Sequence, residues 1–69
     1  MLTVKNAFRH TYGHGGWADV PAGARTTSAS AHGNDFRWVD PSVFPVGSID
    51  RHDADHYGIR VLLDNITEA

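Results

Sequence analysis

The amino-acid sequence predicts a single small domain of the α+β class that is mostly β-strand, and three observations support this class. Short stretches of alternating apolar and polar residues, bounded by glycine, proline or asparagine, recur along the chain. One later stretch, residues 48–58, begins with a capping serine and ends at a glycine, as a short helix does. The length of 69 residues leaves room for one thin hydrophobic core. We therefore expect one domain that covers residues 1–69.

The first half of the chain predicts three strands, separated by a loop and a corner. Residues 2–8 alternate in polarity and predict the first strand. Residues 10–16 contain three glycines, which break regular structure and predict a mobile loop or a wide hairpin turn. Residues 17–20 and 24–28 can extend, and the Pro-Ala-Gly sequence at 21–23 predicts a corner between them.

The second half begins with the clearest strand of the sequence. Turn-forming residues at 32–35 lead into residues 36–39, where Phe36 and Trp38 share one face. Pro41 ends this strand, because proline has no N–H group to donate to a sheet.

A short helix of about two turns is expected next. Ser48 can cap its N-terminus, and Gly58 lies where a glycine commonly ends a helix. We expect Ile49 and Tyr57 to anchor the two ends of the helix on the core. Ala54 is small enough to permit close approach between the helix and the sheet.

Residues 58–63 predict the closing strand, with Ile59, Val61 and Leu63 inward and Leu62 outward. Five short strands with one short helix before the last of them form a small, strongly bent five-stranded barrel. This arrangement is similar to the Src-homology-type folds in architecture. No residues match that family's acidic ligand-binding loop, so the similarity implies no ligand.

The aromatic residues and arginines divide into a predicted core and a predicted contact surface. We expect Phe36, Trp38 and Tyr57 to fill the core, because a small barrel needs two or three large rings. Tryptophan, tyrosine and arginine are enriched at interface hot spots, and an outward-facing leucine favours burial by a partner. The predicted partner-binding residues are Trp17, Arg25, Tyr12, Arg37 and Leu62.

Charge and composition make several classes of partner unlikely. The formal net charge is -2, and the six Lys and Arg residues are scattered along the chain, which disfavours nucleic-acid binding. No apolar run is long enough to span a membrane, and no signal peptide begins the chain, so a cytoplasmic location is expected. The chain contains no cysteine, which excludes disulfides and most zinc-site patterns.

Two histidine pairs at i, i+4 spacing keep a metal-binding alternative open. They are His10 with His14 and His52 with His56. On a helix the second pair shares a face, but Asp53 follows His52 where a zinc protease helix has glutamate. All four histidines would bind one metal only if the glycine-rich loop folded onto the helix. A metal held this way would stabilise so small a domain.

No catalytic or cofactor-binding pattern is found in the sequence. None of the serines stands in a nucleophile elbow, and no cysteine nucleophile is present. The glycines at 13–16 lack the lysine and the following helix that phosphate-binding loops use. We therefore expect neither enzyme activity nor a cofactor.

These observations favour a small non-catalytic protein-binding module, which could act as a homodimer. Compact single-domain chains of this kind look similar to accessory proteins of phages and plasmids, some of which inhibit host nucleases by occupying a protein surface. The similarity implies an inhibitor that works by surface occlusion. A histidine-stapled metal-binding domain and a weak nucleic-acid-binding barrel are the alternatives.

Overall fold

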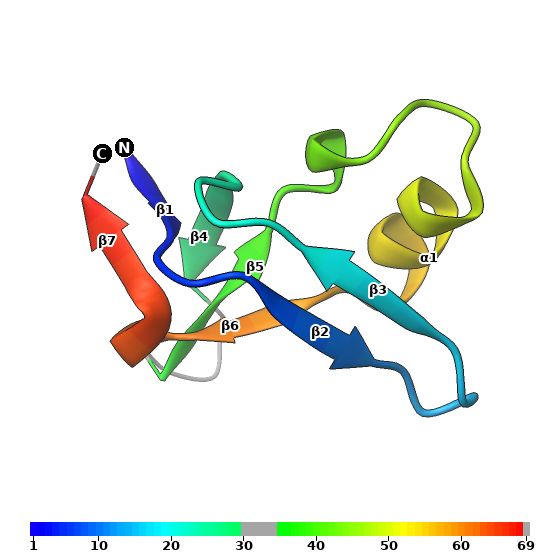
Figure 1. The fold of residues 1–69 in the computed structure, drawn as a ribbon, viewed down its shortest axis with the longest axis horizontal. Helices are drawn as coiled ribbons and strands as arrows, with labels where there is room; N and C mark the ends of the chain where they lie inside the picture. The colour runs from blue at the N-terminus through cyan, green and yellow to red at the C-terminus, as the bar shows by residue number, and fades with distance from the viewer. Residues whose placement is uncertain (30–34, 69) are drawn as a thin grey trace.

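Residues 1–29 and 35–68 are described by the computed structural model, and their elements follow one another as short strands with one helix late in the chain (Figure 1). The elements are β1 (Leu2–Val4), β2 (Phe8–Thr11), β3 (Trp17–Val20), β4 (Thr26–Ala29), β5 (Phe36–Val39), the 3-10 helix η1 (Pro41–Val43), α1 (Ile49–Tyr57), β6 (Arg60–Leu62), the 3-10 helix η2 (Leu63–Asn65) and β7 (Ile66–Glu68).

The strands pair antiparallel in three small sheets, β1-β7, β2-β3 and β4-β5-β6. The α+β class with one short helix is therefore confirmed. The count of five strands was wrong, because the described residues form seven. No closed barrel is detected in the described part of the chain, where the ladders remain in separate sheets.

Asn65 explains why the predicted first strand at 2–8 is divided in two. The Lys5 N–H donates to the Asn65 carbonyl oxygen at 2.8 Å, and the Asn6 N–H donates to Asn65 Oδ1 at 2.9 Å. Asn65 Nδ2 in turn donates to the Asn6 carbonyl oxygen at 3.0 Å. These bonds end β1 and turn the chain into β2. They also lead residues 66–68 into β7 beside β1, so the two ends of the chain lie together (Figure 1).

The glycine-rich segment forms a tight hairpin between β2 and β3. The Tyr12 N–H donates to the Gly16 carbonyl oxygen at 2.8 Å, and the Gly15 N–H donates to the Tyr12 carbonyl oxygen at 3.0 Å. The predicted corner at 21–23 is also a turn, but the strands on its two sides belong to different sheets. Of the predicted turn at 32–35, residues 32–34 lie outside the described residues.

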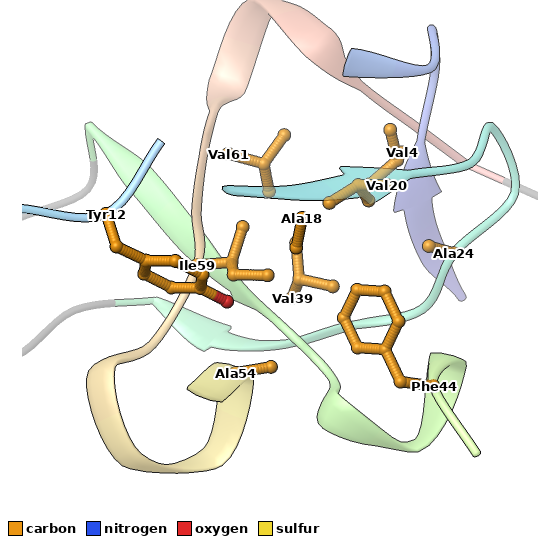
Figure 2. Packing of buried hydrophobic residues seen from close by; sticks show 10 residues of the cluster. All are labelled: Val4, Tyr12, Ala18, Val20, Ala24, Val39, Phe44, Ala54, Ile59 and Val61. Atoms are coloured by element: carbon orange, nitrogen blue, oxygen red, sulfur yellow. The ribbon is translucent and has the colours of Figure 1, made fainter. Parts of the chain in front are cut away.

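Small aliphatic side chains make up most of the core, which lies between the sheets and α1 (Figure 2). Ile59, Val4 and Val20 are its largest fully buried side chains. The remaining buried apolar residues are Tyr12, Ala18, Ala24, Val39, Phe44, Ala54 and Val61.

The predicted aromatic core of Phe36, Trp38 and Tyr57 was wrong, because none of these rings belongs to the buried cluster. Tyr57 is 53% exposed and Tyr12 is 5% exposed, so Tyr12 supplies the buried tyrosine ring. Figure 2 shows this ring reaching into the cluster beside Ile59. Phe36 and Trp38 are half-buried, because they face away from the core on the side of β5 opposite Val39.

The helix forms as its end signals predict, and Ala54 is its one buried residue. Ser48 Oγ accepts a hydrogen bond from the Arg51 N–H at 3.1 Å, and the Gly58 N–H donates to the Ala54 carbonyl oxygen at 3.0 Å. Ala54 is buried, as expected. Ile49 is 78% exposed and does not anchor the start of α1 on the core. Tyr57 is 53% exposed, and its ring lies against the buried Tyr12 ring with centroids 5.6 Å apart.

The closing strand also differs from its prediction at one residue. Ile59 and Val61 are buried and Leu62 is exposed, as their alternation indicates. Leu63, expected inward, is 47% exposed, because the chain leaves β6 there and enters η2.

Gly58→Ala is expected to lower the free energy of unfolding more than Gly47→Ala does. Both glycines have positive φ, 80° and 85° respectively, where a residue with a side chain costs about 1–3 kcal/mol. A Cβ at Gly58 would lie 2.6 Å from Cζ3 of Trp38, whereas one at Gly47 would meet no atom within 4 Å. Overpacking of this kind adds about 1–3 kcal/mol. Urea denaturation measures both losses, and equal losses would contradict a tight Gly58–Trp38 contact.

Candidate functional site

A groove lies between β2 and β6 and is lined by residues of both strands. We call it the β2–β6 groove. Its volume is about 350 Å³, which is within the range of about 300–1,000 Å³ typical of ligand pockets. It is lined by Phe8, Arg9, His10, Thr11, Arg60, Val61, Leu62, Asp64 and Asn65.

A second hollow of about 300 Å³ adjoins this groove. The two share His10, Thr11 and Arg60 as lining residues. The second hollow is further lined by Tyr12, Gly13, Trp38, Tyr57 and Gly58. The groove therefore extends from Asn65, which bonds to the segment between β1 and β2, toward the C-terminal end of α1.

The outer face of β5 and β6 combines apolar and cationic groups beside the groove. The register places Phe36 opposite Leu62 and Trp38 opposite Arg60. The Phe36 and Trp38 rings meet edge to face with centroids 5.2 Å apart, and the Arg60 guanidinium lies 5.3 Å from the Phe36 centroid. Leu62 is 61% exposed. This face thus offers aromatic, aliphatic and cationic contacts within one small area.

Trp17 and Leu62 are the two predicted partner-binding residues with exposed apolar side chains, but they lie on different sheets. Leu62 lines the groove, whereas Trp17, which is 57% exposed, lies on the outer face of the β2-β3 hairpin. The Arg9 guanidinium is 5.2 Å from the Trp17 ring centroid. Arg9 Nε also donates to Asp19 Oδ1 at 2.8 Å, and this bond lowers the pKa of Asp19. The Arg9 charge is therefore matched within the hairpin.

The other three predicted partner-binding residues have roles within the fold. Tyr12 is buried, so its ring is not available at the surface. Arg37 is half-buried, and its Nε donates to Thr26 Oγ1 at 3.3 Å. Arg25 is exposed, and its Nε donates to Met1 Sδ at 3.2 Å. The five predicted residues do not form one surface.

The sequence analysis missed most of the groove, including Phe8, Thr11 and Arg60. No local pattern predicts a groove that exists because two strands do not pair. Arg60 was the one indication of a binding surface in the sequence, since it is a single cation within an otherwise apolar strand.

The glycine-rich loop does fold onto α1, as the metal-binding alternative requires. The His14 ring stacks on Tyr12 at 5.3 Å and lies 4.9 Å from the Tyr57 ring, and its Nε2 is 3.9 Å from Asp53 Oδ2. The His52 and His56 rings stack on each other 5.8 Å apart. Among the described residues, no three histidine or carboxylate side chains converge on one point where they could bind a metal.

Ser42 and Ser48 lie at the N-termini of two helices. Ser48 Oγ donates to the Pro45 carbonyl oxygen at 2.7 Å and caps α1, and Ser42 follows the Asp40 cap of η1. No described hydrogen bond joins a serine to a histidine. None of the described helices has the length and apolar character needed to cross a membrane.

Comparisons of the chain with protein-family models, with curated proteins and with solved structures gave no match. The functional argument therefore rests on the groove and on the side chains around it.

Tyr12→Phe is expected to raise the free energy of unfolding by about 1 kcal/mol. The Tyr12 hydroxyl is buried and has no hydrogen-bond partner among the described residues, a situation that costs about 1–3 kcal/mol. Burial also raises the pKa of this hydroxyl. Tyr57→Phe is the matched control, since Tyr57 is 53% exposed and its loss of a hydroxyl should change stability by less than ~0.5 kcal/mol. In urea denaturation, a less stable Tyr12→Phe protein would show that the hydroxyl has a partner.

His10 is expected to make the fold less stable in mild acid. Burial and, secondarily, the Arg60 charge lower the pKa of His10 from its ordinary value of 6.5. The unfolded chain therefore binds this proton more readily than the folded chain does. The resulting stability is fully present above about pH 6.5 and is lost as the pH falls through the lowered pKa of the folded protein.

Melting temperatures between pH 7.5 and about pH 5 would measure this effect, over the range in which histidines titrate. The decrease in melting temperature should become smaller in His10→Asn and, to a lesser extent, in Arg60→Gln. A His10→Asn protein with the same pH profile as the wild type would contradict the assignment.

Proposed function

We propose that this chain is a small non-catalytic protein-binding module that contacts its partner at the β2–β6 groove. The observation that carries the proposal is the groove itself, with exposed Leu62 and the half-buried Phe36–Trp38 pair beside it. Six of the nine lining residues are polar or charged, and Phe8, Val61 and Leu62 supply the apolar contacts. Concave surfaces of this size are common locations of binding sites.

The residue types around the groove support a protein as the partner. Aromatic rings and arginine contribute most to the energy of protein interfaces, and both are combined here in Trp38 and Arg60. Leu62 adds an apolar side chain that loses contact with water when a partner covers it. The net charge of -2 argues against the phosphate backbone of a nucleic acid. A module of this kind acts by covering a surface of its partner, as an accessory or inhibitor protein does.

Leu62→Lys is expected to abolish binding of the natural partner without unfolding the domain. The side chain is exposed, so a lysine is accepted in the free protein, but a charge in an apolar contact must lose its water. The measurement is retention of proteins from a nuclease-treated lysate by the tagged chain, read by mass spectrometry at moderate salt.

Val46→Lys is the matched control. Val46 is 86% exposed in the connection before α1 and does not line the groove, so this variant should retain the partner. Circular dichroism confirms that both variants are folded. The proposal fails if no protein is retained stoichiometrically, or if Leu62→Lys retains the same protein as well as the wild type does.

A further inference from the structure

The pairing of β2 with β3 shows which backbone groups of β2 face the groove. The Tyr12 N–H bonds to Gly16, and the same register pairs His10 with Ala18. In an antiparallel ladder, hydrogen-bonded pairs alternate with non-hydrogen-bonded pairs. The N–H and C=O groups of Arg9 and Thr11 therefore point away from β3, along the free edge of β2.

The same reasoning applies to β6. The Val39 N–H donates to the Ile59 carbonyl oxygen at 2.9 Å, and the Leu63 N–H donates to the Asp35 carbonyl oxygen at 3.3 Å. Hydrogen-bonded and non-hydrogen-bonded pairs alternate between these two bonds, and Arg60 and Leu62 belong to the non-hydrogen-bonded pairs. Their N–H and C=O groups therefore point away from β5. Both strands are fully described, and no ladder or backbone hydrogen bond joins them to each other. Among the residues that the structure describes, nothing pairs with these two strand edges, which border the groove.

Free strand edges restrict the chemistry of an occupant. Each edge offers N–H donors and C=O acceptors that repeat every second residue, about 7 Å apart. An extended peptide backbone presents the complementary groups at the same spacing, and such addition to a free edge is a common mode of peptide recognition. Proteins usually cover or interrupt exposed edges, so an uncovered edge beside a hollow needs an explanation.

Arg60 adds a charge preference to this geometry. Its guanidinium lies over Phe36, and no described carboxylate is within ion-pair distance of it, whereas Arg9 is already paired with Asp19. Arg60 also lines both hollows of the groove, whereas Asp64 lines only the one that reaches Asn65. An acidic side chain is therefore favoured toward the end of the groove near Trp38 and disfavoured toward Asp64.

We propose that the β2–β6 groove binds an extended peptide segment of another protein, which adds to the free edge of β2 as a strand and places an acidic side chain against Arg60. This inference rests on the proposed function and specifies the chemistry of the partner. Backbone hydrogen bonds provide the affinity, and Arg60, Leu62 and Trp38 select the side chains.

The test uses a displayed library of short random linear peptides, selected on the full chain. Selected peptides should carry an aspartate or glutamate at one fixed position. With the selected peptide bound, amide hydrogen exchange measured by NMR should slow at least tenfold at Arg9 and Thr11. N-methylation of the peptide at the residues that face β2 should abolish binding, whereas N-methylation at the alternate residues should leave binding within a few-fold of the original.

Substitution of Arg60 separates the charge contact from the backbone pairing. Arg60→Gln should weaken binding of the selected peptide about two- to fivefold, the effect of one exposed ion pair. Changing the peptide's acidic residue to its amide should weaken binding of wild type by a similar factor and binding of Arg60→Gln no further.

The remaining outcomes would overturn the inference. If no peptide is selected, or if a peptide binds without slower exchange at Arg9 and Thr11, strand addition is wrong. The proposed function still stands in that case if a lysate protein binds the wild type and Leu62→Lys abolishes this binding. If the chain alone sediments as a dimer with these amides protected, the occupant is a second copy and not a foreign peptide. If a lysate protein binds Leu62→Lys as well as it binds the wild type, the proposed function fails as well.

Discussion

The hydrogen bonds of Asn65 are the constraint on which the arrangement of the strands depends. They join the segment after β1 to the segment after β6, so these two segments turn at the same place. On one side of this junction β1 and β7 pair, and on the other β2 and β6 separate. Because the core between the sheets is built mainly from valine, alanine and isoleucine, the hairpin and the three-stranded sheet meet over small side chains. The groove is the space that this divergence leaves at the surface.

Local features of the fold were predictable from the sequence because local chemistry determines them. Ser48 supplies a side-chain acceptor for a free helix N–H, Gly58 takes a positive φ that other residues avoid, and Pro41 cannot continue a ladder. Each of these effects acts within a few residues of its cause. The helix and the strand at 36–39 therefore have the bounds that the sequence indicates, within one or two residues.

Features that depend on distant partners were not predictable in this way. β7 has three residues, and only its pairing with β1 across the length of the chain makes it a strand. The sequence around Tyr12 and Tyr57 does not show which of the two rings is buried. The hairpin turn places the Tyr12 ring in the core and leaves Tyr57 exposed beside it, with ring centroids 5.6 Å apart. The groove was not predictable for the same reason, because a gap between two strands leaves no pattern in the sequence of either strand.

The free edges of β2 and β6 also favour self-association of the chain at high concentration. An edge that accepts a strand from a partner accepts one from another copy with the same hydrogen bonds, and such additions can continue without closure. Nothing in the backbone pattern distinguishes the two events, so only side chains such as Arg60 and the abundance of each species decide between them. If the groove binds a peptide as proposed, colloidal stability and recognition are opposed in this molecule, and an excess of the chain over its partner would favour self-assembly.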